Sequence, residues 1–259
     1  MTNVRFSKTL LGTVAALALL ANVGCSSKPK RGTLAPLTAP SWSTPLEVKG
    51  FGPATLALPL GATTPRPIVV VLHGAADRAE WQCGSFRGVL GGRVFILCPQ
   101  GVRSAVTGLY GLGSFDDSVA ELRAALAALK SRFGAHVAPS PVLIIGYAEG
   151  AAVAADLARQ EPAFFARVAL VNGDPAAFSS SATRIFAERG GKRVLFFCTN
   201  HACEATGAER AVLLTRAGAA AKSIKANVGP YLDQHFTDAL KAELPWLVEG
   251  DARWVGSRR

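Results

Sequence analysis

Five short apolar runs, each followed by a stretch of helical composition, constrain the fold of this chain more than any other feature. Because each run is apolar at every position and not at alternate ones, we expect strands that are covered on both faces. Such strands form a parallel sheet between two layers of helices, so the alternation predicts a doubly wound α/β domain. The runs are residues 68–72, 94–97, 142–145, 168–171 and 194–197.

The clearest helical stretch begins after Ser114 and ends at Gly134. Apolar side chains recur every three or four positions between these residues, which gives a helix one apolar face. Ser114 and Asp117 have the spacing of a capping box, and Gly134 is placed as a C-terminal stop. The sequence therefore predicts both ends of this helix.

Less regular segments flank the buried runs. Alternating apolar residues predict two antiparallel strands at residues 46–51 and 54–59, and a late edge strand at residues 221–228. Residues 236–249 predict a closing helix that is interrupted at Pro245. The chain contains no nucleotide-binding glycine fingerprint and no phosphate loop. We therefore expect the functional site in the loops that follow the carboxyl ends of the parallel strands.

The start of the chain has the pattern of a secretory signal peptide. Arg5 and Lys8 precede an apolar run at residues 10–21, which is shorter than a membrane-spanning helix requires. Gly24 and Cys25, followed by two serines, resemble the processing site of bacterial lipoproteins, in which the cysteine carries the lipid. The alternative is a soluble secreted protein that is cleaved nearby.

These features predict three segments and a location. Residues 1–24 form the signal peptide, residues 25–44 form a tether rich in Ser, Pro, Thr and Lys, and residues 45–259 form one folded α/β domain. The expected location is the bacterial cell envelope, with the lipid on Cys25 as the anchor to the membrane. Cleavage would remove two of the 28 basic residues and none of the 18 acidic ones, so a net charge of +8 remains. Because these charges are scattered, we expect no nucleic-acid partner.

Export places the remaining cysteines in an oxidising environment, where disulfides are favoured. Proximity in the sequence pairs Cys83 with Cys98 and Cys198 with Cys203. A zinc site at the second pair, with the histidine between the two cysteines and the glutamate after them, is the alternative. These residues lack the paired C-x-x-C and H-x-x-x-H spacings that are typical of zinc sites. We therefore predict two disulfides, and we expect no metal and no cofactor.

Three segments together resemble the α/β-hydrolase fold. VVVLHG (residues 69–74) is similar to the strand and His-Gly turn that begin the oxyanion loop. FDDSVAELRAAL (residues 115–126) is similar to the Asp-Asp helix of the secreted esterase and polyhydroxybutyrate-depolymerase-like branch, and GYAEGAA (residues 146–152) to the nucleophile elbow. The match covers residues 45–248 and implies a mostly parallel sheet with helices on both faces.

The elbow of this chain lacks the residue that performs catalysis in that fold. The pattern G-x-S-x-G holds a nucleophilic serine in a tight turn between a strand and a helix. Gly146 and Gly150 supply the two glycines, but Ala148 occupies the position of the serine. An alanine methyl group cannot attack a carbonyl carbon, so the resemblance implies an inactive nucleophile position.

The resemblance also assigns the remaining parts of a hydrolase site. The backbone N–H of Glu149 and donors in the loop at Gly74 and Ala75 would form the oxyanion hole. His235 stands where the fold places its general base, as a remnant of that base; the alternative is a histidine in a surface loop. Asp174 is the candidate acid, although an Asp before Pro is typical of a turn.

The usual position of the acid, after the run at residues 194–197, holds Asn200, with Glu204 somewhat later. Two other groups are weaker candidates for a relocated nucleophile. The Glu149 carboxylate is expected to point away from the substrate, and the serines at residues 179–181 are typical of a loop.

The sequence therefore predicts an exported, lipid-anchored protein that has lost serine-hydrolase catalysis and binds a ligand or an envelope partner. The ligand that suits the remaining cleft is a small ester-like molecule or a glycan. One alternative is an active carboxylic-ester hydrolase with a non-standard nucleophile, and another is a structural envelope protein without a ligand.

Overall fold

A computed structural model of the protein describes residues 33–257, and the side chains of residues 33–254. The expected signal peptide and the lipidation site at Cys25 lie outside this part of the chain. Within it, no helix is both long and apolar enough to cross a membrane.

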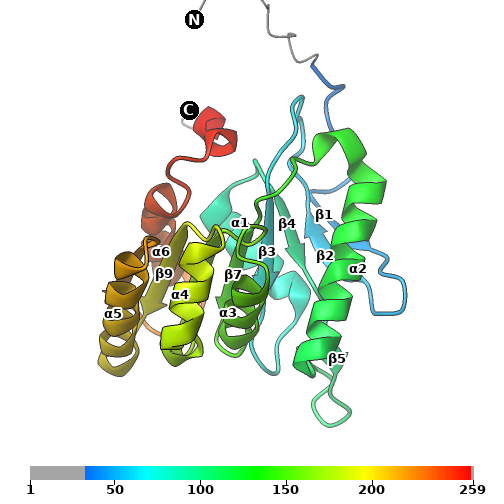
Figure 1. Ribbon diagram of the computed structural model, residues 1–259. Coiled ribbons are helices and arrows are strands. Elements are labelled where there is room, and N and C mark those ends of the chain that lie inside the picture. The colour runs from blue at the N-terminus through cyan, green and yellow to red at the C-terminus, as the bar shows by residue number, and fades with distance from the viewer. Residues whose placement is uncertain (1–32, 258–259) are drawn as a thin grey trace, which may run out of the picture. The chain divides into compact units, whose positions relative to one another are not determined.

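Eight strands form one mixed, mostly parallel sheet in the order β1-β2-β4-β3-β7-β8-β9-β10 (Figure 1). Strands β1 and β2 pair antiparallel, and β2 joins the parallel part antiparallel to β4. A separate hairpin consists of β5 (Val102–Arg103) and β6 (Tyr110–Gly111). The sheet strands are β1 (Ser43–Leu46), β2 (Ala54–Ala57), β3 (Ile68–Leu72), β4 (Phe95–Cys98), β7 (Leu143–Tyr147), β8 (Arg167–Val171), β9 (Arg193–Cys198) and β10 (Ala220–Lys225).

Helices cover both faces of the sheet, as the sequence predicts. Figure 1 shows α2 to α5 on the near side of the sheet. Side chains of α1 and α6 pack with those that point to the opposite face, such as Val69 and Val71, whereas Val70 packs with the residues of α2 to α5. Burial on both faces explains why the strand runs do not alternate. The helices are α1 (Ala79–Leu90), α2 (Phe115–Phe133), α3 (Gly150–Gln160), α4 (Ser180–Glu188), α5 (His201–Arg216) and α6 (Gln234–Leu247), with short 3₁₀ turns η1 (Gly134–His136), η2 (Pro175–Ala177) and η3 (Ala252–Ser257).

The first strand differs from the prediction. It spans Ser43–Leu46 and not residues 46–51, because the chain turns after Leu46. In this turn Gly50 has φ +87°, and the Phe51 N–H donates to the Val48 carbonyl over 3.0 Å. Leu46 and Val48 are both buried and lie two positions apart, which is the spacing of a strand. However, β1 ends at Leu46, and Val48 belongs to the turn that follows.

The expected tether is partly packed onto the domain. Leu37 is buried, and its N–H donates to the Ala62 carbonyl over 3.0 Å. The N–H of Leu34 donates to the Thr63 carbonyl over 2.8 Å. Contact with the domain therefore begins about ten residues before the expected boundary at residue 45, because a composition typical of a linker does not reveal backbone hydrogen bonds to a distant loop.

The predicted ends of α2 are confirmed, whereas the interruption at Pro245 is wrong. Ser114 accepts the N–H of Asp117 over 3.2 Å, and Gly134 caps the other end with φ +40°. Helix α6 runs through Pro245 to Leu247. Proline has no N–H and so cannot donate one of the hydrogen bonds of the helix. Because Pro245 lies in the last turn, this loss does not interrupt the helix.

Both predicted cysteine pairs are disulfides in the structure. Cys83 of α1 is joined to Cys98 at the end of β4, with the Cα atoms 6.0 Å apart. Cys198 at the end of β9 is joined to Cys203 in the first turn of α5, with the Cα atoms 5.6 Å apart. The second bond ties the end of a parallel strand to the helix that follows it.

Candidate functional site

Strand β7 enters helix α3 through a tight turn centred on Ala148. Ala148 has φ +50°, a left-handed conformation that is uncommon for a residue with a side chain. A Cβ atom at Gly146 would lie 2.3 Å from the Gly150 carbonyl oxygen, and one at Gly150 would lie 2.4 Å from the Leu72 carbonyl oxygen. Both positions therefore require glycine, as the elbow pattern in the sequence indicates.

Left-handed backbone recurs in the loops after three adjacent strands. Ala76 after β3, Ala148 after β7 and Asn172 after β8 have φ values of +51°, +50° and +50°. These strands are neighbours in the sheet, so the three residues gather at one edge of it. Backbone strain of this kind concentrates at functional sites, which makes this edge the candidate site.

Two backbone N–H groups lie beside Ala148, that of Gly74 in the loop after β3 and that of Glu149 in the turn itself. Gly74 lies so close that an added Cβ atom would be 3.1 Å from the Cβ atom of Ala148. Within the described domain, neither the N–H of Gly74 nor that of Glu149, at the start of α3, has a protein acceptor. Ala75, the other expected oxyanion residue, is exposed. The turn thus leaves N–H groups available to an oxygen atom of a ligand.

A buried network of hydrogen bonds, which the sequence analysis did not predict, holds the turn at His73 and Gly74 in place. The ring nitrogens of His73 lie 2.7 Å from the Gly74 carbonyl oxygen and 3.0 Å from that of Gln100. The buried Glu121 carboxylate accepts the N–H groups of Gln100 and Gly101 over 2.9 and 3.1 Å. One signal was present, since Glu121 lies three residues after Ser118 and four before Ala125, both of which face the core.

The structure places His235 in the first turn of α6, where it is exposed. The next residue, Phe236, is buried, and its ring packs edge to face against Tyr147 with the centroids 6.2 Å apart. The start of α6 therefore lies beside the elbow. Within residues 33–254, the imidazole of His235 makes no hydrogen bond and no ion pair.

Neither Asp174 nor Asn200, the residues at the positions considered for the acid, is paired with a histidine. Asp174 is exposed and accepts the N–H of Ala176 over 2.8 Å, so it caps η2 as a turn former. Asn200 accepts the N–H of Cys203 over 2.9 Å and caps α5. In the described part of the chain, no hydrogen bond or ion pair joins any histidine to a carboxylate, so these residues do not assemble a catalytic triad.

Two hydroxyl groups near this edge, those of Tyr147 and Ser179, have structural partners. Burial, the charge of Asp77 and the phenol of Tyr231 raise the pKa of Tyr147, in that order. Tyr147 therefore stays protonated at neutral pH and donates to the Pro230 carbonyl over 2.6 Å. Ser179 accepts the N–H of Ala182 and caps α4. These contacts give neither group the role of a relocated nucleophile.

The described side chains hold no group of three or more His, Cys, Asp or Glu that suits a metal ion. Two pockets of the described domain lie away from the elbow. One, of about 1050 Å³, is lined by the ends of α1 and α6, and the other, of about 260 Å³, lies between α2 and α3. Neither is lined by Gly74, Ala148 or His235, so neither is the ligand cleft that the sequence predicts.

No family model matches the sequence, and no curated protein matches it. Solved structures do resemble the domain. Fluorophosphonate-binding serine hydrolase F of Staphylococcus aureus shares 12% identity, over 80% of this chain and 97% of that one, with a TM-score of 0.58. A carboxylesterase of Mesorhizobium loti shares 16% identity, over 79% of this chain and 99% of that one, with a TM-score of 0.55.

A third similar structure comes from a study of two fungal esterases of Rhizomucor miehei. It shares 13% identity, over 79% of this chain and 82% of that one, with a TM-score of 0.55. The narrower resemblance to polyhydroxybutyrate depolymerases stays a prediction. At identities this low the likeness concerns the fold alone, and the fold of this chain is that of the α/β-hydrolases.

Proposed function

We propose that this chain is a non-catalytic protein with an α/β-hydrolase fold. It binds a ligand or an envelope partner with the loops around Ala148, at the carboxyl ends of β3, β7 and β8. The observation that carries the proposal is the position of Ala148. This residue occupies the strained turn, between two glycines that no other residue can replace. A methyl group has no electron pair with which to attack a carbonyl carbon, so the turn is retained without its chemistry.

The other catalytic positions support the same conclusion. In a serine hydrolase, a carboxylate orients the histidine and stabilises its positive charge. Here His235 has no carboxylate partner within the described chain. At the end of β9, where the resemblance puts the acid, Asn200 caps α5 and a disulfide joins Cys198 to Cys203. The amide of Asn200 carries no negative charge, so it cannot stabilise a positively charged histidine as a carboxylate does.

The retained donors indicate what the site binds. Gly74 lies close to Ala148 and Glu149 follows it in the turn, so their N–H groups lie near the position at which an oxyanion would be held in an active relative of this fold. They suit a carbonyl or hydroxyl oxygen of a small ester-like molecule or a glycan. Without a nucleophile, such a ligand is held and released unchanged.

A fluorophosphonate probe tests the loss of catalysis, because it reacts covalently with an activated hydroxyl and adds a defined mass. We expect no labelling of the wild type. Labelling of Ala148→Ser that is lost in Ala148→Ser/His235→Ala would show that the base and the oxyanion donors are retained. A measurement of weak ester turnover cannot replace this test, since a protease without its triad serine still accelerates the reaction about 10³- to 10⁴-fold over water.

Stoichiometric labelling of the wild type would overturn the proposal. It would favour the alternative of an active carboxylic-ester hydrolase, and mapping of the labelled peptide would then identify the nucleophile. Labelling of neither protein would leave the wild type non-catalytic and would mean that the base has also lost its function.

We further propose that the protein is exported and anchored to the membrane by a lipid on Cys25. The charged start, the short apolar run and the Gly24-Cys25 pair support this location. Radiolabelled palmitate should enter the wild type expressed in bacteria and should not enter Cys25→Ala. Equal labelling of the two proteins would contradict the anchor.

A further inference from the structure

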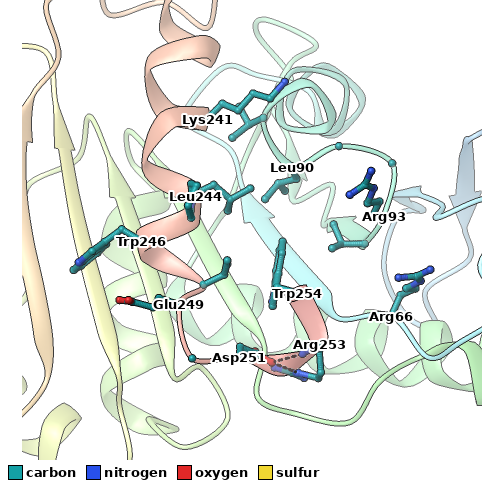
Figure 2. Close-up of a pocket in the computed structure, with 17 residues that line it drawn as sticks. Arg66, Leu90, Arg93, Lys241, Leu244, Trp246, Glu249, Asp251, Arg253 and Trp254 are labelled. Carbon is teal, nitrogen blue, oxygen red and sulfur yellow. Dashed lines mark hydrogen bonds and ion pairs between the residues drawn. The ribbon is translucent and has the colours of Figure 1, made fainter. Parts of the chain in front are cut away.

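A second candidate site lies at the other edge of the sheet. The pocket of about 1050 Å³ is lined by Arg66 and Val94, which precede β3 and β4, whereas the elbow follows the carboxyl end of β7. The last turns of α1 and α6 and the residues of η3 complete the lining (Figure 2). This volume is in the range of pockets that enclose a small ligand.

The pocket has an apolar interior. Leu90 and Trp254 are buried, Leu244 is half-buried, and Figure 2 shows these three side chains around the hollow. Their surfaces supply dispersion contacts and exclude water from the body of a ligand. An apolar group of a ligand is therefore favoured in this part of the pocket.

The two acidic residues in the lining are already neutralised by other side chains. Asp251 accepts hydrogen bonds from Arg253 over 2.8 and 2.6 Å. Glu249 points away from the hollow in Figure 2 and pairs with Arg193 over 2.5 Å. Neither carboxylate is free to compensate a further cation in the pocket.

Two cations in the lining have no such partner. The side chains of Arg66 and Lys241 make no hydrogen bond and no ion pair within the described residues, and the buried Nε of Arg66 lacks an acceptor. The backbone of Arg66 is held in place, since its N–H donates to the His136 carbonyl over 2.8 Å and its carbonyl accepts the N–H of Ala138 over 2.8 Å. A half-buried guanidinium without a counter-charge, on a backbone that is held in place, suits the binding of an anion.

From this arrangement we infer that the pocket binds a single-chain anionic amphiphile, a molecule with one carboxylate or phosphate head and an apolar body. The Arg66 guanidinium binds the head through charge-assisted hydrogen bonds. The body lies against Leu90, Leu244 and Trp254, and Lys241, across the hollow from Arg66 in Figure 2, adds to the positive potential of the pocket. This site is separate from the elbow, so the inference does not depend on the proposed loss of catalysis.

Equilibrium dialysis of the full chain against radiolabelled probes tests the inference. The probes are decanoate, decyl phosphate, the neutral decanol and inorganic phosphate. We expect one decanoate or decyl phosphate to bind per chain, and decanol to bind about tenfold more weakly because it lacks the charge. A preference between the two anionic probes would identify the head as a carboxylate or a phosphate.

Matched variants separate the pocket from other apolar surfaces. Arg66→Gln should weaken decanoate binding about tenfold and leave decanol binding unchanged. Arg210→Gln is its control, because Arg210 also has a buried Nε without an acceptor but lies on α5, outside the pocket. Lys241→Glu should weaken decanoate binding, whereas Lys225→Glu, at the exposed end of β10, should not. Circular dichroism melts verify that each variant is folded.

Three results would overturn the inference. The first is decanol binding as tight as that of decanoate. The second is unchanged decanoate affinity in both folded variants, Arg66→Gln and Lys241→Glu. The third is no binding of either anionic probe below about 1 mM, or binding of inorganic phosphate as tight as that of decyl phosphate.

Discussion

The hydroxyl of Tyr147 donates a 2.6 Å hydrogen bond to the carbonyl oxygen of Pro230, and so joins the residue before Ala148 to the loop that leads to His235. The Nδ2 of Asn172 donates to the same oxygen over 3.3 Å. The ends of β7 and β8 thus hold this loop together. This contact and the packing of the buried Phe236 against Tyr147 together position His235 relative to Ala148, because no partner of the His235 side chain lies in the described chain.

We expect Tyr147→Phe to lower the free energy of unfolding by about 1 kcal/mol, since it removes one hydrogen bond and keeps the packing of the ring. Urea unfolding measures the change. Tyr231→Phe is the control, because Tyr231 is 77% exposed, and it should change stability by less than about 0.5 kcal/mol. Equal stabilities of the two variants would show that the contact with Pro230 contributes nothing.

The elbow glycines should not tolerate a side chain. A Cβ atom at Gly150 would lie 2.4 Å from the Leu72 carbonyl oxygen and 2.6 Å from that of His73, and backbone atoms cannot move aside as a side chain can. We expect Gly150→Ala to lose about 2 to 3 kcal/mol in urea unfolding. At Gly88 in α1 an added Cβ meets nothing within 4 Å, so Gly88→Ala should gain up to about 1 kcal/mol. A mild effect at Gly150 would contradict the tight turn.

The strained conformation of Ala148 predicts a stabilising substitution. Glycine adopts a φ of +50° without the steric cost that a Cβ atom imposes, so Ala148→Gly should raise the free energy of unfolding by about 1 kcal/mol. Ala152 is exposed and helical, and Ala152→Gly should lower it by about the same amount. Destabilisation by both changes would mean that position 148 is not strained.

The ion pairs beside the large pocket predict a pH dependence. Burial acts to raise the pKa of the Asp251 carboxyl, but the hydrogen bonds from Arg253 outweigh it, so the pKa is lowered. A lowered pKa contributes stability that is present above the unfolded value of about 3.9 and is lost as the pH falls through the folded value. The side chain of Asp251 is only 8% exposed, and it forms ion pairs with both Arg253 and Arg167.

We therefore expect Asp251→Asn to cost about 3 kcal/mol at neutral pH, because it leaves buried arginines without their counter-charge. The difference from the wild type should shrink below about pH 4. Chemical unfolding between neutral and acidic pH measures both. Asp156→Asn removes the half-exposed pair with Arg159 and should cost less than about 0.5 kcal/mol. A difference that persisted undiminished in acid would refute the role of the Asp251 charge.

Much of the site edge was readable from local patterns. The residues of GYAEG are close neighbours in the chain, so their pattern alone indicated the tight turn with Ala148 at its centre. The disulfide pairs also join cysteines that are 15 and 5 residues apart. The roles of His235 and Asp174 were not readable in this way, because each depends on whether a partner from another loop lies within reach.

The sequence by itself determined the parallel strands, since a strand that is buried on both faces is apolar at every position, whatever covers it. It also determined the ends of α2, because a cap and a stop lie within one turn of the residues they serve. Only the tertiary structure revealed that Glu121 holds the loop at Gln100, 21 residues away, and that Arg66 and Lys241 line one pocket. Contacts between distant segments arise when packed helices and strands bring them together, and no local pattern of residue types encodes that proximity.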